Sequence, residues 1–307
     1  MKVRSVLLSA AMLAACSGGS DTETTPASSD TNPQVTTAAE FAAPSTTPLH
    51  VLKLDCGIIQ ISDLDGFSDA GDFAGQSDTF ANTCWLVRHP EGDLLWDLGL
   101  PTELVGAGEQ ESDVFTLSMD RTITDQMRDF GYAPWDLDYV SISHSHFDHT
   151  GQADQFQDAI WLVHEAESEN MFPQNPQPVE NDPDVDGEVT APFANFATLT
   201  QKTFSGEYDV FGDGSVLILP TPGHTPGHTS LLIMLPETGP VLLTGDLYHR
   251  RVSRTLRRVP RFNSDATQTM TSMDLFEARA EDLGAKVIIQ HSSEDIAELP
   301  APPDALR

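Results

Sequence analysis

Residues 144–149 read His-Ser-His-Phe-Asp-His and place three imidazoles and one carboxylate within six residues. Neutral imidazole and ionised carboxylate are ligands that zinc and neighbouring transition metals accept. In an extended backbone the side chains of His144 and His146 leave the same face, and Asp148 keeps that parity. His149 points the other way unless the chain turns inside the motif. With such a turn, one cation would receive the first two imidazoles and a second cation would receive Asp148 and His149.

Six residues cannot complete two coordination spheres, so further ligands must come from downstream segments. The sequence offers three, each at the end of an apolar run: His224 after residues 216–219, Asp246 after residues 241–245, and His291 after residues 285–290. The hexapeptide itself follows residues 139–143, which alternate as a half-buried strand would. Because a rigid strand aims a ligand and a loop lets several ligands converge, the four runs predict one shared metal site.

The order of these residues resembles the metallo-β-lactamase-fold hydrolases, whose signature is an HxHxDH motif, here residues 144–149. The resemblance covers residues 49–300 of the chain. Within the superfamily, residues 82–90, 95–99 and 245–249 look most similar to N-acyl homoserine lactonase-like members. The resemblance implies an α/β fold, a four-layer αβ/βα sandwich with the metal site at one edge of two mixed sheets.

The resemblance also assigns a role to each of seven ligands. It implies that one metal is held by His144, His146 and His224, that the other is held by Asp148, His149 and His291, and that Asp246 bridges both. The cofactor would be two divalent ions, with Zn²⁺ the expected ion, which share a water and make it hydroxide near neutral pH. The metal-binding β-lactamases proper lack the bridging aspartate, so Asp246 argues against that branch.

The chain departs from the lactonases close to Asp246. In those relatives a tyrosine three residues after the bridging aspartate helps to polarise the substrate carbonyl. Here that offset holds His249, and Tyr248 comes one residue earlier. Tyr248 is therefore expected to stabilise the oxyanion, with His249 as its rival, while Asp148 passes a proton to the departing alkoxide.

These residues lead to one functional expectation and two alternatives. The first is a dinuclear metal-dependent hydrolase that opens the lactone ring of N-acyl homoserine lactones, a small-molecule substrate, by attack of a metal-bridging hydroxide. The second is a metallohydrolase of another ester, thioester, phosphodiester or lactam, because a fold does not determine its substrate. The third is a non-catalytic envelope lipoprotein that only binds metal. A homodimer is left open.

The N-terminus has the pattern of an exported protein. Residues 1–15 have a basic start and a short apolar stretch that ends Leu-Ala-Ala before Cys16, which resembles a lipoprotein processing box. Cleavage there would leave a lipid on Cys16 as the only membrane contact, at the outer membrane and facing the periplasm. An ordinary secretory signal is the alternative. Residues 16–48 have the composition of a disordered tether, and residues 49–307 would form the hydrolase domain.

The net charge of the chain excludes two classes of binding partner. The chain has 16 basic and 47 acidic residues, and removing residues 1–15 takes two basic ones, so the mature charge would be 14 − 47 = −33. Such a surface repels nucleic acid and anionic membranes.

Cys56 and Cys84 are interpreted as two small buried thiols, with a disulfide as the alternative that export would permit.

Two stretches near the expected site remain open to more than one interpretation. Six arginines lie within residues 250–261, and they are expected to form ion pairs with the acidic surface or a subunit partner. The alternative is that they receive a carboxylate or phosphate of the substrate. Residues 172–193 are rich in proline and acid, and they form either a loop over the cleft or a solvated surface insertion.

Local patterns predict the elements of the sandwich. Strands are expected near residues 49–62, 80–88, 93–97, 138–143, 159–163, 205–211, 215–220, 229–235, 240–245 and 285–290. Helices are expected near residues 120–130, 152–157, 164–171 and 265–283. The last helix has an apolar stripe at spacings of three and four and a capping sequence at 263–265, which is typical of a helix that packs on a sheet.

Overall fold

The computed structural model describes residues 48–173 and 193–307. The expected leader, the lipid site at Cys16, nearly all of the tether and most of the stretch 172–193 lie outside the described residues, so the interpretations of those segments stay predictions. Within the described ranges, no helix combines the length and the apolar character that crossing a bilayer requires.

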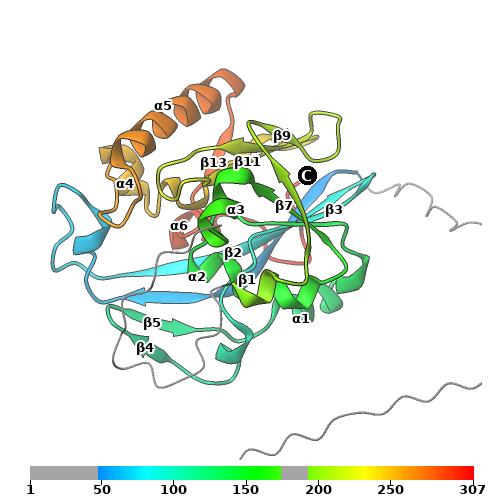
Figure 1. Ribbon diagram of the computed structural model, residues 1–307, viewed down its shortest axis with the longest axis horizontal. Coiled ribbons are helices and arrows are strands. Elements are labelled where there is room, and N and C mark those ends of the chain that lie inside the picture. The colour runs from blue at the N-terminus through cyan, green and yellow to red at the C-terminus, as the bar shows by residue number, and fades with distance from the viewer. Residues whose placement is uncertain (1–47, 174–192) are drawn as a thin grey trace, which may run out of the picture. The chain divides into compact units, whose positions relative to one another are not determined.

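The first sheet has eight strands in the order β4-β5-β1-β2-β3-β6-β7-β8 (Figure 1). Its strands are β1 (His50–Ile61), β2 (Asp78–His89), β3 (Gly92–Trp96), β4 (Gln110–Ser112), β5 (Phe115–Ser118), β6 (Tyr139–Ser141), β7 (Ile160–His164) and β8 (Thr200–Phe204). Neighbours from β4 to β3 pair antiparallel, and β3, β6, β7 and β8 run parallel. This sheet is therefore mixed.

The second sheet has five strands in the order β13-β12-β11-β10-β9. They are β9 (Tyr208–Asp209), β10 (Val216–Pro220), β11 (Thr229–Leu235), β12 (Gly239–Leu243) and β13 (Lys286–Ile288). All neighbours are antiparallel except β12 and β13, which run parallel. The second sheet is mixed as well, as the resemblance implied.

The helices lie between and beyond these strands. The α-helices are α1 (Ile123–Asp129), α2 (Phe147–Thr150), α3 (Glu165–Met171), α4 (Arg251–Leu256), α5 (Ala266–Leu283) and α6 (Ser293–Ala297). The short 3₁₀ helices are η1 (Asp65–Phe67), η2 (Thr102–Leu104), η3 (Pro134–Asp136), η4 (Ala153–Phe156), η5 (Ala194–Phe196) and η6 (Gly245–Leu247). The expected cap of α5 is present, because the Asp265 side chain accepts a hydrogen bond from the Gln268 backbone N–H at 2.8 Å.

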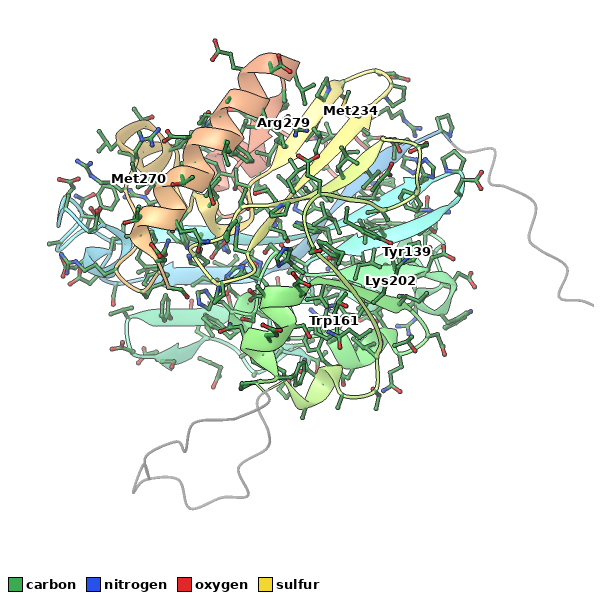
Figure 2. The ribbon with its side chains drawn as sticks, turned by 45° about the horizontal axis from the view of Figure 1, so that its top comes forward. Tyr139, Trp161, Lys202, Met234, Met270 and Arg279 are labelled. Carbon is green, nitrogen blue, oxygen red and sulfur yellow. A yellow bond between two sulfur atoms is a disulfide. The ribbon has the colours of Figure 1, made fainter. Side chains whose placement is uncertain are left out.

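Three groups of buried side chains show that the layers follow the order helix, sheet, sheet, helix. The central group joins Trp85 and Trp96 of the first sheet to Ile218 and Ile233 of the second. The outer face of the first sheet packs on α1 and η5, where Trp161 lies (Figure 2). The outer face of the second sheet packs on α5, through side chains that include Leu242, Met273 and Phe276. The predicted four-layer sandwich is confirmed.

Several elements differ from the prediction. The strand expected at 205–211 is replaced by β8 at 200–204 and the two-residue β9, and the helix expected at 152–157 is a 3₁₀ helix. Strand β8 has no alternating apolar pattern, because its first four residues, Thr-Gln-Lys-Thr, are polar and exposed on the edge of the sheet. The elements β4, β5, α4 and α6 are short and were also not predicted.

The interpretation of Cys56 and Cys84 as free thiols is wrong, because the two residues form a disulfide with a Cα–Cα distance of 5.9 Å. Cys84 is paired with Leu54 in the register of β1 and β2, and Cys56 lies in a bulge of β1 between Asp55 and Ile58. Both cysteines lie in the core on the outer face of the first sheet, within the distance that a disulfide spans. Alternation alone cannot reveal a bulge, so the sequence left this pairing undecided.

Candidate metal centre

All seven predicted ligands lie at the edge of the sandwich where β6, β10, β12 and β13 end. They are His144, His146, Asp148, His149, His224, Asp246 and His291, and they form two groups whose ligand atoms lie within 4.8 Å of one another inside each group. Strand β6 belongs to the first sheet and the other three strands to the second, so the packing of the sheets brings the groups together.

The turn expected inside the motif is present. The backbone of His146 is still extended, with φ −70° and ψ 157°, and α2 begins at the next residue. The turn breaks the alternation of the strand, and Asp148 and His149 therefore both belong to the second group.

The first group is formed by three imidazoles. The Nε2 atom of His224 lies 3.1 Å from Nε2 of His144 and 3.0 Å from Nδ1 of His146. His144 is fully buried, and His224 is 1% exposed. Three ring nitrogens that converge at this spacing form a compact nitrogen donor set, as zinc prefers.

The second group combines one carboxylate with two imidazoles. The Nε2 atoms of His149 and His291 are 3.3 Å apart. Oδ2 of Asp148 lies 3.5 Å from the first of these nitrogens and 3.4 Å from the second. This set also has the composition of a transition-metal site.

Asp246 lies between the two groups and turns one oxygen to each. Its Oδ2 is 3.5 Å from Nε2 of His144 and 3.4 Å from Nε2 of His224. Its Oδ1 is 3.3 Å from Nε2 of His149 and 2.9 Å from Nε2 of His291. The position is the one that a bridging carboxylate would need.

The protonation pattern of the imidazoles fits metal ligands. An acceptor oxygen lies beside Nδ1 of three of them: Asn263 Oδ1 at 2.8 Å from His224, the Ala81 carbonyl at 2.9 Å from His291, and Asp97 Oδ2 at 3.1 Å from His149. Such an acceptor keeps the proton on Nδ1, so Nε2 turns a lone pair toward the centre. Oδ1 of Asp246 is buried and has no hydrogen-bond partner among the described residues, as expected of an oxygen that faces lone pairs. Divalent cations would satisfy these atoms.

Burial and charge set the protonation of the ligands. Burial lowers the pKa of His144 well below its ordinary value and that of His146 to about 4, so both imidazoles are neutral at neutral pH. Burial also acts to lower the pKa of His149, but three surrounding carboxylates outweigh it and raise that pKa well above its ordinary value. Burial acts to raise the pKa of Asp246, yet the surrounding histidines hold it well below the usual range. A site whose carboxylates favour a positive charge also favours a metal ion in place of the proton.

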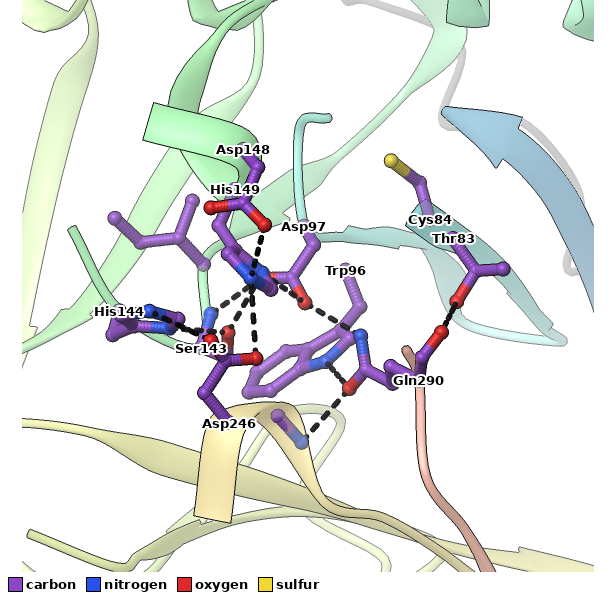
Figure 3. Close-up of polar contacts among 12 residues, drawn as sticks. Thr83, Cys84, Trp96, Asp97, Ser143, His144, Asp148, His149, Asp246 and Gln290 are labelled. Carbon is purple, nitrogen blue, oxygen red and sulfur yellow. Dashed lines mark hydrogen bonds and ion pairs between the residues drawn. The ribbon is translucent and has the colours of Figure 1, made fainter. Parts of the chain in front are cut away.

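Asp97 orients the second group by its contact with Nδ1 of His149. It follows β3 and has a φ of +63°, and its Oδ1 accepts a hydrogen bond from the Ser143 backbone N–H at 2.6 Å. Its Oδ2 lies beside His149 and accepts from Gln290 Nε2 at 2.7 Å (Figure 3). Gln290 in turn accepts from the Gly245 backbone N–H at 3.0 Å. One carboxylate thus connects three of the ligand-bearing segments.

The roles of Asp97 and Gln290 were not predicted from the sequence. Asp97 follows an apolar run, which is the same signal that identified Asp246 and His291. His228, four residues after His224, is no member of either group. Its Nε2 accepts a hydrogen bond from the Asp246 backbone N–H at 2.9 Å, so it holds the backbone of the central carboxylate.

Tyr248 does not reach the centre, contrary to the role expected for it. It is 1% exposed and packs in the core beneath α5, with its ring 6.1 Å from that of Phe276. Burial and the neighbouring Glu277 raise its pKa. The backbone at this residue is extended, with φ −141° and ψ 134°, so the next side chain points to the opposite side.

His249 occupies the place beside the ligands. Its Nε2 lies 3.0 Å from Oδ2 of Asp246, and its ring stacks on that of His291 with a centroid distance of 5.7 Å and an angle of 10°. Of the two candidates that the sequence left open for assisting the carbonyl, the structure brings only His249 to the centre.

Two cavities open beside His249 and His291. The smaller, of about 60 Å³, has an apolar wall made of Ile59, Ile61, Phe67, Phe80, Phe115, Phe147 and Phe262, and it touches Asp148 and Asp246. The larger, of about 250 Å³, has a mixed polar and apolar lining that includes Thr79, Phe80, Arg250 and Ser293. The apolar cavity lies directly over the carboxylates of the candidate centre.

The arginine cluster forms ion pairs, as the favoured interpretation expected. Arg250 pairs with Asp78, Arg251 with Asp295 and Glu298, Arg254 with Glu277, Arg257 with Asp274, Arg258 with Asp72 and Arg261 with Asp65. The partners lie between η1 and the start of β2, in α5, and in α6 and the residue that follows it. The pairs therefore attach α4 and the residues that flank it to these three parts of the molecule.

Comparison with known proteins agrees with this geometry. Residues 77–291 match the family model described as Metallo-beta-lactamase superfamily. The chain belongs to the metallo-beta-lactamase superfamily. An N-acyl homoserine lactonase AttM of Rhizobium radiobacter is 31% identical to it over 226 residues, which cover 72% of this chain and 85% of that protein.

Solved structures show the same fold. The crystal structure of a quorum-quenching N-acyl homoserine lactone hydrolase has a TM-score of 0.69 and 26% identity, over 86% of this chain and 100% of that chain. An N-acyl homoserine lactone hydrolase with the product N-hexanoyl-L-homoserine at its catalytic metal center has a TM-score of 0.70 and 24% identity, over 84% of this chain and 98% of that chain. The expected superfamily, its fold and the expectation of a metal-dependent hydrolase are confirmed.

Proposed function

We propose that this hydrolase opens the lactone ring of N-acyl homoserine lactones. The observation that carries the proposal is Asp246, which lies between two ligand groups with one oxygen toward each. Relatives of about 30% identity are named N-acyl homoserine lactonases, and a structural neighbour holds the product N-hexanoyl-L-homoserine at its catalytic metal center. The alternative of a lipoprotein that only binds metal has no support from these relatives.

The seven ligands would hold two divalent ions in the groups described above. When bound, such a pair supplies Lewis acidity and a water whose pKa is lowered to about 7. The carboxylate of Asp148 lines the apolar cavity and is 6% exposed, so it can accept the proton of that water and return it to the departing alkoxide. The burial of the centre excludes bulk water, which strengthens each of these interactions.

His249 is proposed to polarise the lactone carbonyl in place of the tyrosine of related lactonases. His249 belongs to neither ligand group, so its Nε2, 3.0 Å from Oδ2 of Asp246, can carry a proton at the centre, whereas the ligand histidines turn a lone pair. It also lines both cavities beside the centre. A neutral N–H donor placed there can hydrogen-bond to the carbonyl oxygen and stabilise it as it becomes negative.

The apolar cavity favours substrates with an apolar acyl chain. Five phenylalanines and two isoleucines surround the opening, and Phe147 and Phe262 are 44% and 45% exposed. Binding of an alkyl chain over these rings is favoured by a free energy of about 25 cal/mol for each Å² of apolar surface removed from water. We therefore expect kcat/KM to rise with acyl length until the chain extends past the phenylalanines.

A substrate panel tests the proposed reaction. N-hexanoyl and N-decanoyl homoserine lactones, a chromogenic β-lactam and an activated phosphodiester are given to the zinc-loaded wild type and to Asp246→Asn. Lactone opening is followed by the proton that it releases. The proposal expects the lactones to have the highest kcat/KM and Asp246→Asn to lose at least about 100-fold of it. Faster turnover of the β-lactam or the phosphodiester would support the other metallohydrolase.

A pair of neighbouring variants tests the role of His249. His249→Ala should lower kcat for the lactones about 100-fold, the cost of removing one oxyanion donor. His249→Tyr should recover part of that loss. Tyr248→Phe is the control, and its kcat should remain within about twofold of wild type because its side chain packs beneath α5. A larger loss of kcat in Tyr248→Phe than in His249→Ala would assign the role to Tyr248.

We also propose that the enzyme is tethered to the cell envelope by a lipid on Cys16. The support is the sequence around Cys16, a short apolar leader that ends Leu-Ala-Ala. The full-length chain expressed in a bacterium should fractionate with membranes and incorporate a labelled fatty acid. Cys16→Ser should abolish the label. Label incorporation that persists in Cys16→Ser would contradict the assignment.

A further inference from the structure

Glu167 is a buried carboxylate in contact with two of the ligand-bearing segments. It lies in the first turn of α3 and is 1% exposed. Its Oε1 accepts a hydrogen bond from the Ser145 backbone N–H at 2.7 Å. Its Oε2 accepts from the Thr225 hydroxyl at 2.7 Å and from the Gly227 backbone N–H at 2.9 Å. Glu167 thus connects the hexapeptide loop to the loop that follows β10.

The environment of Glu167 suits an ionised carboxylate. A buried charge is costly unless it is paired or fully hydrogen-bonded. Within residues 48–173 and 193–307, the ion pairs include none with Glu167. Its three short hydrogen bonds come only from donors, and donors of this kind stabilise a carboxylate in the absence of a cation. The carboxylate therefore depends on both loops for its solvation, and both loops depend on it for their geometry.

The residues that Glu167 holds are adjacent to the ligands of one group only. Ser145 lies between His144 and His146, and Thr225 directly follows His224. The second group has other outer contacts, because His149 is oriented by Asp97 and His291 by a backbone carbonyl. The Ser143 hydroxyl contacts one ligand of each group, His144 and His149, but each group also has outer contacts that the other lacks.

We infer that Glu167 is a positioning residue that sets the metal affinity of the His144–His146–His224 group and leaves the other group unaffected. This inference rests on the ligand set proposed above. Its carboxylate determines the separation of the two loops, and that separation determines whether the three ring nitrogens converge. Outer contacts of this kind commonly change metal affinity by about 10–100-fold when they are removed.

The glycine at position 227 shows how closely α3 approaches the second loop. A Cβ atom at this position would lie 2.1 Å from the backbone nitrogen of Glu167 and 2.6 Å from its Cβ. Real Cβ atoms do not approach so closely, so any larger residue would push the loop away from the carboxylate. The segment that carries His224 therefore packs directly against α3.

The test measures the affinities of the two metal positions separately. The purified full chain is stripped of metal and titrated with Zn²⁺ against a chromophoric chelator, well below its unfolding temperature. Glu167→Gln should lower one of the two affinities about 10–100-fold and leave the other within about threefold, because an amide nitrogen would then face a donor. The matched control is Glu169→Gln, which removes an exposed charge from the same helix and should bind like wild type.

His224→Ala separates failure of the inference from failure of the proposed centre. It should weaken the same metal position as Glu167→Gln. If His224→Ala weakens one position while Glu167→Gln keeps both affinities, with or without a lower unfolding temperature, Glu167 is only structural and the inference is overturned. If His224→Ala also keeps both affinities, the ligand set itself is wrong. Thr225→Val, which removes one donor, replaces Glu167→Gln if that variant does not fold, and should weaken the same position several-fold.

Discussion

Replacing Asp97 by asparagine should impair both the stability of the fold and the metal affinity of the second group. The carboxylate of Asp97 accepts from Ser143 at 2.6 Å and from Gln290 at 2.7 Å, and it faces Nδ1 of His149 at 3.1 Å. An asparagine has one acceptor oxygen and one NH₂ group. Whichever way the amide turns, its NH₂ faces at least one of these three donors.

The size of the effect follows from that count. A hydrogen bond to a charged group contributes about 1.5–3 kcal/mol, and one or two of the three are lost, so the free energy of unfolding should fall by about 2–5 kcal/mol. For a domain of this size the unfolding temperature would drop by about 5–15 °C. If the NH₂ group faces His149, the ring must move its proton to Nε2, which blocks the lone pair that the metal needs. Zinc affinity at that position should then fall about 10–100-fold.

Two assays check this prediction. Thermal unfolding followed by circular dichroism gives the stability, and competition with a chromophoric chelator gives the two zinc affinities. Asp158→Asn, an exposed aspartate beside β7, is the control and should resemble wild type in both. An Asp97→Asn protein that unfolds like wild type and keeps both affinities would refute the hydrogen-bond count and the tautomer argument together.

Three further predictions concern the rest of the molecule. Replacing both Cys56 and Cys84 by alanine opens a link across 28 residues and should lower the free energy of unfolding by about 3.5 kcal/mol, measured by denaturant titration under oxidising conditions. Reversing the charges of Arg254 and Arg257 should leave KM for the lactones unchanged, because both side chains already pair with carboxylates of α5; a several-fold rise in KM would restore a role in substrate binding. Removal of metal by a chelator should lower the unfolding temperature by about 5–10 °C, and Zn²⁺ should restore it; an unchanged temperature would show that no tightly bound ion had supported the fold.

The sequence by itself identified the candidate ligands and determined the class of fold. Imidazole and carboxylate side chains at the ends of apolar runs have few structural uses, so His144, His224, Asp246 and His291 could be selected before any contact was known. The alternation of the strands and the apolar stripe of α5 follow backbone periods of two and 3.6 residues. These periods are local, so they can be recognised in the sequence. The edge strand β8 was missed because its polar residues carry no such pattern.

Only the tertiary structure decided which neighbours support these ligands. The contact of Asp97 with Gln290 spans 193 positions, and that of Glu167 with Gly227 spans 60, so spacing along the chain says nothing about either. The choice between Tyr248 and His249 depended on which side of an extended segment faces the centre, and this is set by the packing of α5. Spacing constrains local geometry, whereas partners distant in sequence are brought together only when the two sheets and their helices pack.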